Sequence, residues 1–308
     1  MLRSIRPLAL LVVAPCLTLL GAQVTAAAPA PPACPIETMQ PAPITLAYLA
    51  RNKVVSAKTP DEAVKAIRDG MKGLFDDKSK TNPNGRDYLL AQFYTLAMEF
   101  GKDVQTRGDL GMPGDKAATV DLVVGADSLF SMIEKAEAKC VTEIDQWRQY
   151  KPYAAMVSAA YKILAAGNAD SAEHLAKRAL ILYKAGPQPY DVIWRAAQKR
   201  GDDAGSVTHL QVAIEHLAGD TANSAVRANY MYTLGRMQQD FGDKKTDKAA
   251  KAALYRSAVK AYMDLLKEYP SAEESAFAFQ GISVASMLTS DTAMGLAAVE
   301  VLKASPSK

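Results

Sequence analysis

The sequence predicts an all-α protein, built as an α-solenoid of antiparallel helix pairs. From Ile44 onward, apolar residues recur at three- and four-residue spacing, with little of the alternation typical of strands. Gly, Pro, Asn and Asp separate these stretches and mark the connections between helices. In the C-terminal half, equivalent turns at Gly167 and Gly201 are 34 residues apart. A period of this length indicates stacked units rather than one closed core.

Residues 1–28 have the composition of a cleaved secretory signal peptide. Two arginines precede an apolar run from Leu8 to Leu20, and small residues follow at 26–28. We therefore expect a periplasmic or secreted protein. The run is too short for a stable membrane span, and no later stretch reaches the roughly 20 apolar residues that a span needs. Neither Cys16 nor Cys34 lies in a context typical of a lipoprotein signal, so we expect ordinary cleavage.

Signal cleavage would leave two cysteines, Cys34 and Cys140. In an oxidising compartment this pair favours one internal disulfide. Such a bond would close a loop of about 105 residues, for which chain entropy suggests up to roughly 4 to 5 kcal/mol of stabilisation. The alternatives are two free thiols, or a bond from Cys34 to another chain.

The charge of the mature chain is close to balanced. Removal of the signal leaves 34 basic residues against 33 acidic ones. This balance gives no indication of nucleic acid binding or of strong attraction to anionic lipid. With 49% apolar and 22% charged residues, the chain has ordinary globular composition.

A linker and a helical region precede the repeats. Residues 29–43 contain six prolines, which disfavour helix, so we expect an extended linker. The N-terminal helical region should span 44–152, with Thr59 capping its second helix. Polar, glycine-containing stretches at 78–85 and 101–115 should be exposed loops. The helices are expected at about 44–56, 60–76, 86–100 and 116–149.

The helix pairs from residue 153 onward resemble the tetratricopeptide repeat (TPR). In the first unit, Ala160 takes the small position of the first helix and Gly167 takes the turn. In the second unit, Tyr190 takes the bulky entry position and Gly201 the turn, but Trp194 stands where a small residue is usual. That difference suggests a wider helix crossing. The units are expected at about 153–186, 187–220, 221–270 and 274–307.

The last two units also show the resemblance. The third has Leu234 and Gly235 in the family's first-helix pattern, followed by about eleven extra residues that lengthen one or both helices or the turn. The fourth has Phe277 and Val284 in family positions and would cap the array. Residues 44–152 could be diverged units of the same kind. The alternative is an unrelated helical bundle whose spacing is coincidental.

The resemblance implies a binding groove lined by the first helices. Arginines at equivalent positions of adjacent units could hold a carboxylate of an acidic peptide, and tyrosines would add apolar contact area. The alternative is that these side chains simply form a solvated helix face. The groove positions carried over from the family are Val157, Tyr161, Leu164, Asp191, Arg195, Gln198, Lys199, Asn229, Tyr232, Arg236 and Gln239.

Catalytic and metal chemistry find no support in the sequence. His174, His209 and His216 lack the four-residue spacing that would place two ligands on adjacent helical turns, so we expect no metal site. Ser283 is not in a nucleophile-elbow motif. We expect no cofactor and no enzymatic activity. The basic insert around residues 243–254 could meet an acidic partner or lipid headgroups, or be a solvated face.

The function predicted from these observations is that of an adaptor or assembly scaffold that binds peptide segments in its groove. The expected partners are other proteins or peptides, with peripheral envelope association and the oligomeric state left open. One alternative is a structural subunit of a cell-envelope complex that uses its outer face or its ends. Another is an enzyme whose site lies in the N-terminal helices, which would require a polar pocket with perturbed carboxylates.

Overall fold

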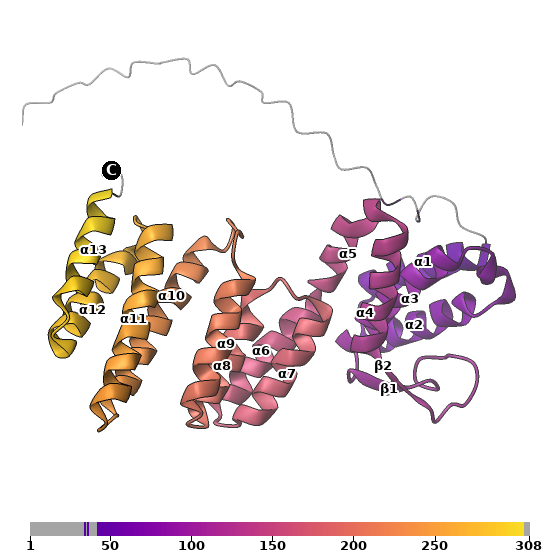
Figure 1. The fold of residues 1–308 in the computed structure, drawn as a ribbon. Helices are drawn as coiled ribbons and strands as arrows, with labels where there is room; N and C mark the ends of the chain where they lie inside the picture. Colours follow the sequence, from indigo (N-terminus) through magenta and orange to yellow (C-terminus); the bar gives the residue numbers. More distant parts are fainter. Residues whose placement is uncertain (1–33, 35, 37–41, 305–308) are drawn as a thin grey trace, which may run out of the picture. The chain divides into compact units, whose positions relative to one another are not determined.

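The protein is an all-α repeat solenoid. The computed structural model describes Cys34, Ile36 and residues 42–304, and these form thirteen α-helices and one two-stranded sheet. Consecutive helices pack side by side along the chain (Figure 1). The expected signal peptide at 1–28 lies outside the described residues, and so do residues 305–308.

The first three helices begin at identifiable caps. They are α1 (Ala42–Ser56), α2 (Pro60–Leu74) and α3 (Pro83–Glu99), close to the predicted bounds. The Thr59 side chain accepts a hydrogen bond from the Glu62 amide at the start of α2. Asn82 does the same for Gly85, which lets α3 begin three residues earlier than predicted. Between them, a short 3₁₀ helix, η2 (Asp77–Thr81), occupies part of the predicted loop.

The helix predicted over 116–149 is wrong, because this segment is divided. A strand β1 (Val104–Thr106) pairs antiparallel with β2 (Thr119–Asp121), and the helix α4 (Leu122–Ala136) follows directly. The Asp121 carboxylate accepts hydrogen bonds from the amides of the next turn, which fixes the start of α4. The 3₁₀ helix η3 (Ala138–Cys140) and the helix α5 (Val141–Arg148) complete the segment.

A disulfide between Cys34 and Cys140 joins the start of the described chain to η3, between α4 and α5. Both cysteines are fully buried, and the Cys34 amide donates a hydrogen bond to Glu143 Oε1 at 3.1 Å. Ile36 is also buried, whereas Ala42, expected in the linker, already belongs to α1. The other residues expected in the linker before Ala42 lie outside the described residues.

Eight helices in four pairs follow. The turns after α6 and α8 share one local chemistry: Gly167 and Gly201 have positive φ angles of 93° and 75°, which favour glycine, and each is followed by a capping Asn or Asp. The periodicity of the sequence therefore corresponds to a repeated turn. The helices are α6 (Lys151–Ala165), α7 (Ala169–Leu182), α8 (Pro187–Lys199), α9 (Asp203–His216), α10 (Ser224–Asp243), α11 (Lys248–Glu268), α12 (Glu273–Thr289) and α13 (Thr292–Ala304).

The extra residues of the third pair lengthen both of its helices. The helices α10 and α11 have 20 and 21 residues, against 13 to 15 in the four helices before them. The basic insert is divided between the short turn after α10 and the first turns of α11, where Asp247 caps the helix. Lys251 Nζ lies 3.6 Å from Asp243 Oδ1, so part of the positive charge is neutralised within the pair.

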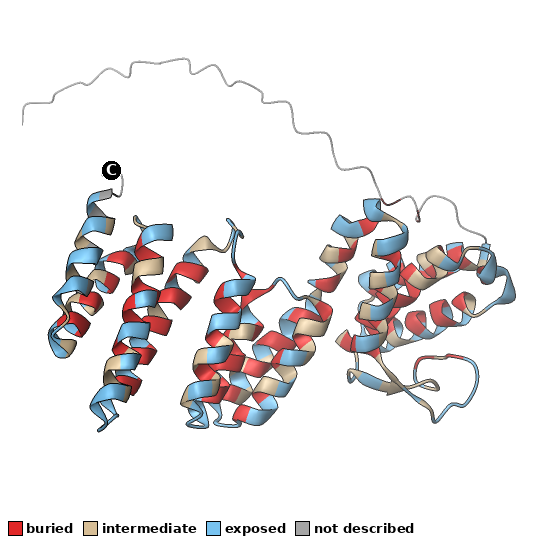
Figure 2. Ribbon diagram, viewed as in Figure 1, coloured by how far each residue is buried: buried red, intermediate tan, exposed pale blue. Residues whose placement is uncertain are grey.

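Buried residues lie where neighbouring helices meet, and exposed residues cover their outer sides (Figure 2). Alanines at 160, 172, 176 and 196 are fully buried where α6, α7 and α8 meet, and their small size lets the helices approach closely. Around α10, α11 and α12 the core is aromatic, with Tyr255 and Tyr262 fully buried. Over the described ranges, no helix is long and apolar enough to cross a bilayer.

Candidate functional site

The first helices α6 and α8 meet at a buried carboxylate. Asp191 on α8 is only 8% exposed, so it is not the groove-lining side chain that the family pattern implied. Its Oδ2 accepts hydrogen bonds from the Tyr161 hydroxyl at 3.0 Å and from Arg195 Nε at 2.7 Å. Burial and the nearby charge of Asp191 raise the pKa of Tyr161, which keeps the hydroxyl protonated as a donor.

This carboxylate holds Arg195 in a fixed position. One edge of the guanidinium is bonded to Asp191, and its carbon lies 4.6 Å from the ring centre of Trp194. The Arg195 side chain nevertheless remains 51% exposed. The ion pair therefore orients a guanidinium whose other edge faces solvent and can bind a carboxylate.

Tyr230 is a residue of this site that the sequence did not single out. It is buried on α10, and its hydroxyl donates to the Pro187 carbonyl at the start of α8, at 3.3 Å. Burial, with a further contribution from the charge of Asp191, raises its pKa. Tyr230 thus connects α8 to α10. Its position in the helical pattern is that of an ordinary core residue, and no sequence signal distinguishes it.

Tyr262 on α11 packs against both α10 and α12. Its ring projects from α11 between Gly235 on α10 and Gly281 on α12, where a β-carbon would lie 2.3 Å and 2.5 Å from ring atoms. The Tyr262 hydroxyl donates to Gln239 Oε1 at 2.8 Å, and Gln239 Nε2 donates to the Gly281 carbonyl, also at 2.8 Å. The absence of side chains on both glycines gives the ring its space.

Tyr232 and Asn229 lie at the front of the same junction. The ring centre of Tyr232 is 5.9 Å from that of Tyr262 and 6.0 Å from that of Phe277 on α12. Asn229 Nδ2 donates to Glu274 Oε1 at 3.4 Å. The first helices of the third and fourth pairs therefore share one continuous aromatic and polar surface.

The predicted groove residues divide into exposed and buried sets. Val157 and Leu164 are 8% and 5% exposed and pack in the core, so the groove role implied for them is wrong. Tyr161, Tyr232 and Gln239 are half-buried. Among the described residues, the predicted groove residues of α8 make no hydrogen bond or ion pair with those of α10. The exposed members are Arg195, Gln198, Lys199, Asn229 and Arg236.

The sequence analysis did not predict that apolar side chains on α12 would be exposed. Phe277, Val284 and Leu288 are 49%, 39% and 56% exposed. The first two are residues that match positions of the repeat family. Gly281 on the same face packs against the Tyr262 ring, so neighbouring helices cover this side of α12 only in part.

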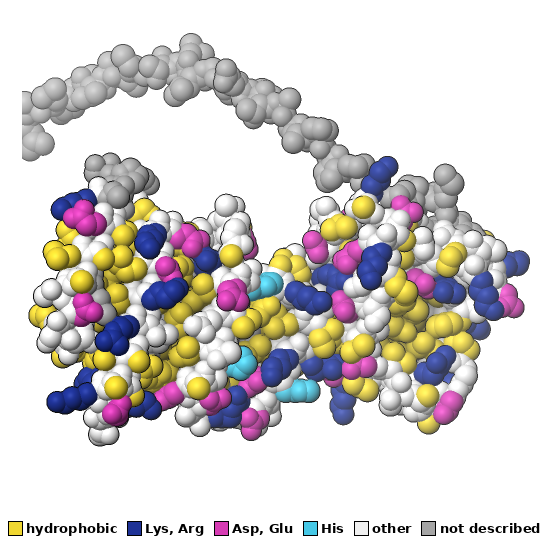
Figure 3. Space-filling view, viewed as in Figure 1, with side chains coloured by type: hydrophobic (Ala, Val, Ile, Leu, Met, Phe, Trp, Pro, Cys, Tyr) yellow, Lys and Arg dark blue, Asp and Glu magenta, His cyan; other side chains and the backbone are white. Residues whose placement is uncertain are grey.

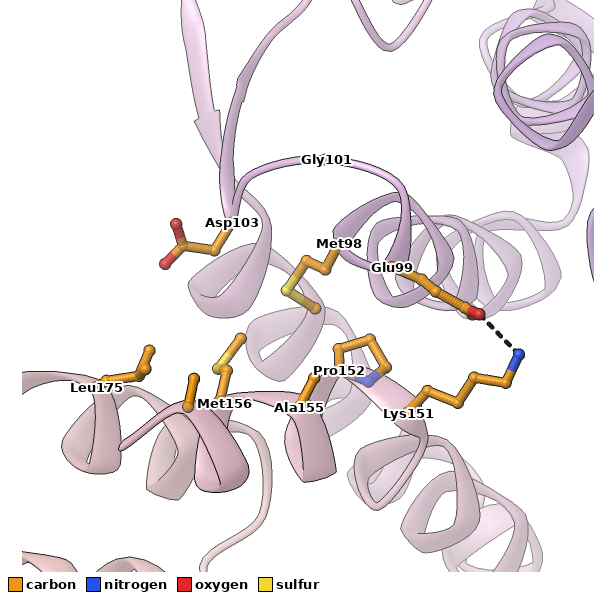
Figure 4. A pocket seen from close by; sticks show the side chains of 10 residues that line it. Met98, Glu99, Gly101, Asp103, Lys151, Pro152, Ala155, Met156 and Leu175 are labelled. Carbon is orange, nitrogen blue, oxygen red and sulfur yellow. Dashed lines mark hydrogen bonds and ion pairs between the residues drawn. The ribbon is translucent and has the colours of Figure 1, made fainter. Parts of the chain in front are cut away.

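An apolar pocket of about 320 Å³ lies where α3 ends against α6 and α7 (Figure 4). Met98 and Met156 face each other across it, and Leu175 closes one side. At its rim, Lys151 Nζ lies 2.6 Å from Glu99 Oε1, so this carboxylate is already neutralised. The lining is largely apolar and has no unpaired charged group that would specify a ligand.

A second hollow of about 500 Å³ lies between α9 and α11, on the second helices of the repeats. Ile214, Met231 and Leu234 form its floor, with Lys260 and Glu215 at its rim. Hydrophobic surface flanked by charged side chains is visible there in Figure 3. The floor side chains are almost completely buried, which leaves little apolar area for a partner.

The enzyme alternative requires a polar pocket in the N-terminal helices, and the polar cluster found there surrounds Arg148. This buried guanidinium bonds to Asp127 Oδ1 at 2.6 Å, to Glu134 Oε1 at 3.0 Å and to the Leu182 carbonyl at 3.0 Å. Burial, with a smaller effect of Glu134, raises the pKa of the neighbouring Asp145. Because Arg148 is saturated by acceptors from α4 and α7, the cluster is best explained as a structural network that joins these helices.

Metal binding has no geometric basis in the part of the chain that the structure covers, where no group of three or more His, Cys, Asp or Glu residues converges. His216 instead stacks on Tyr190, with ring centres 4.7 Å apart.

Comparisons with known proteins do not assign this chain to a family. No family model matches it, and no curated protein matches its sequence. Among solved structures, it is similar to one titled "Circular tandem repeat protein with novel repeat topology and enhanced subunit contact surfaces". That similarity covers 85% of this chain and 69% of the other, with 11% identity and a TM-score of 0.24, which is too low to support an argument. The protein is a helical repeat protein, a fold that suits a scaffold for protein interactions.

Proposed function

We propose that this protein is an exported adaptor or assembly scaffold of the TPR type, which binds a peptide segment of another protein along the exposed side of α8, α10 and α12. The observation that carries the proposal is the position of Arg195. An ion pair with the buried carboxylate of Asp191 and the contact with the Trp194 ring orient its guanidinium, yet half of the side chain remains exposed. Fixing an exposed arginine in this way reduces the entropy that it loses when it binds a carboxylate.

Further exposed polar side chains extend this surface. Gln198 and Lys199 follow Arg195 on α8, and Asn229 and Arg236 continue on α10. The row carries three cations, so an acidic segment is the favoured ligand. The assignment to the TPR type rests on the repeated turns at Gly167 and Gly201 and on the Leu234–Gly235 pattern. The proposed export rests on the N-terminal sequence alone.

A rival function is a structural subunit that binds through the ends of the array. Exposed leucines favour it: Leu46 and Leu49 on α1 are 65% and 51% exposed, and Leu296 on α13 is 67% exposed. Terminal repeats of a solenoid normally carry a polar outer face, so apolar residues there can indicate contacts with other subunits.

Site-specific photo-crosslinking in the native envelope separates the two functions. A photoreactive amino acid replaces Gln198 or Asn229 on the proposed binding surface, Arg256 on the exposed side of α11, or Leu296 at the end of the array. The groove function predicts that one extended segment of another protein is crosslinked from positions 198 and 229 and not from position 256. Crosslinks from position 296 alone would refute it in favour of the structural subunit.

A further inference from the structure

The sequence contains one Asn-Gly dipeptide, Asn84–Gly85, and it lies in the first turn of α3. An asparagine followed by glycine is especially prone to deamidation, because glycine has no β-carbon to hinder the attack of its own nitrogen on the asparagine side chain. The products are aspartate and isoaspartate, in which the main chain runs through the former side-chain carboxyl. Asn84 is therefore the candidate for spontaneous modification.

The reaction requires a glycine nitrogen that can give up its proton. This nitrogen forms a bond to Asn84 Cγ, the side-chain nitrogen leaves as ammonia together with that proton, and water then opens the cyclic imide at either of its two carbonyl carbons. Asn82 cannot react in the same way, because the nitrogen of Pro83 carries no proton.

In the folded protein the Gly85 nitrogen is already engaged. Its amide donates a hydrogen bond to Asn82 Oδ1 at 3.0 Å, and Gly85 is buried, whereas Asn84 is half-buried. The next amide, that of Arg86, donates to the Asn82 carbonyl at 3.1 Å. A nitrogen held in a helical turn with its proton bonded to a cap neither loses that proton readily nor turns toward the Asn84 side chain.

Asn82 is also held from its other side. Its amide donates to the Ser79 carbonyl at 3.3 Å, and the hydroxyl of the fully buried Ser79 donates to the Gly73 carbonyl at 2.8 Å. These bonds connect the end of α2 to the start of α3. The acceptor of the Gly85 proton is thus itself fixed by the fold.

Modification at position 84 would affect a helix on which the N-terminal region depends. Every residue of α3 from Tyr88 to Met98 is buried. Aspartate at position 84 would be compatible with the helix, because a carboxylate is favourable in a first turn. Isoaspartate adds an atom to the main chain there, which disrupts the regular spacing of the helical hydrogen bonds.

We propose that Asn84 is a deamidation site and that the side chain of Asn82 suppresses the reaction in the folded protein. The reaction then proceeds only when the first turn of α3 opens, so its rate reports how often that turn opens. Removing the cap should raise the population of the opened turn about fivefold, the factor that corresponds to the roughly 1 kcal/mol typical of a helix N-cap.

Peptide mapping by mass spectrometry tests the proposal. The loss of the Asn84 amide is followed over time at mildly alkaline pH, with the protein either in native buffer or in concentrated urea. The native wild type should deamidate at least about tenfold more slowly than the unfolded chain. Asn82→Ala should accelerate the native reaction about fivefold and should leave the rate in urea within about twofold of the wild type.

Asn168→Ala is the matched control. The Asn168 side chain caps α7 in the same way, since it accepts from the Ser171 amide at 3.1 Å, but it lies in a different helix pair. This variant should leave the native rate at Asn84 within about twofold of the wild type.

The outcomes separate the two parts of the proposal. Equal acceleration by both variants, or no acceleration by Asn82→Ala, overturns the protective role of Asn82. Equal rates for the folded and the unfolded wild type overturn protection by the fold altogether. An Asn84 side chain that stays intact in urea overturns its assignment as a deamidation site.

Discussion

Adding a methyl group at Gly235 tests the packing of α10 and α12 around the Tyr262 ring. An alanine in a helix is normally more stable than glycine by about 0.5 to 1 kcal/mol. At position 235, however, the new β-carbon would lie 2.3 Å from an atom of the Tyr262 ring, which is fully buried and is held by its hydrogen bond to Gln239. Overpacking of this kind costs about 1 to 3 kcal/mol. We expect Gly235→Ala to lower the free energy of unfolding by about 1 to 2 kcal/mol.

A double-mutant cycle isolates the contact. Once Tyr262→Ala has removed the ring, Gly235→Ala should become stabilising, so the coupling energy should be about 1.5 to 3 kcal/mol. Because Tyr262→Ala alone costs about 3 to 5 kcal/mol, all proteins are measured in the same concentration of a stabilising osmolyte. Urea unfolding followed by circular dichroism gives the free energies.

Gly242→Ala is the control within the same helix. Its β-carbon would lie 3.5 Å from Leu254 Cβ, an ordinary contact, so this variant should not destabilise in either background. If Gly235→Ala stabilises the protein while Tyr262 is present, the ring does not lie against Gly235 and our account of the α10–α12 junction fails.

Three further predictions concern stability. Changing both cysteines, Cys34→Ser with Cys140→Ser, should lower the free energy of unfolding by up to about 4 to 5 kcal/mol, as measured by urea unfolding, because the disulfide restricts the conformations of the unfolded chain. Unchanged stability would contradict this explanation. Arg148→Met should cost about 2 to 3 kcal/mol in the same assay, because it leaves the partly buried carboxylates of Asp127 and Glu134 without their cation, and a cost below 1 kcal/mol would contradict the network. Hydrogen bonds from Arg178 lower the pKa of Asp121, so its stabilisation is present above about pH 4 and is lost at lower pH. The fall in melting temperature between pH 6 and pH 3 should therefore be smaller in Arg178→Gln, and an equal fall would refute this.

Local chemistry explains why the repeat fold could be predicted from sequence. The turns at Gly167 and Gly201 each combine a glycine with a capping Asn or Asp, and these residues determine the backbone wherever they occur. The division of 116–149 could not be predicted in the same way. The strand at Thr119–Asp121 has three residues, too few for a periodic signal, and it exists because β1 pairs with it.

The sequence predicted only part of the candidate site, because the burial of a side chain depends on which helices lie beside it. Arg195 and Arg236 are exposed as the family pattern implied, whereas Val157 and Leu164 are buried in the core. Phe277, which matches a position of the family, is half exposed. A helical pattern defines faces, but it does not say which face the next pair of helices covers.

The central claim is that partners bind the exposed side of the first helices. The most direct test compares proteins that co-purify from the native envelope with the wild type, with Arg195→Glu plus Arg236→Glu, and with Arg256→Glu plus Lys267→Glu on α11, quantified by isotope-labelled mass spectrometry. Circular dichroism verifies that all three are folded. We predict that at least one partner is reduced about tenfold or more by the groove pair and less than twofold by the α11 pair. Equal recovery of every partner with the groove pair and the wild type would contradict the claim.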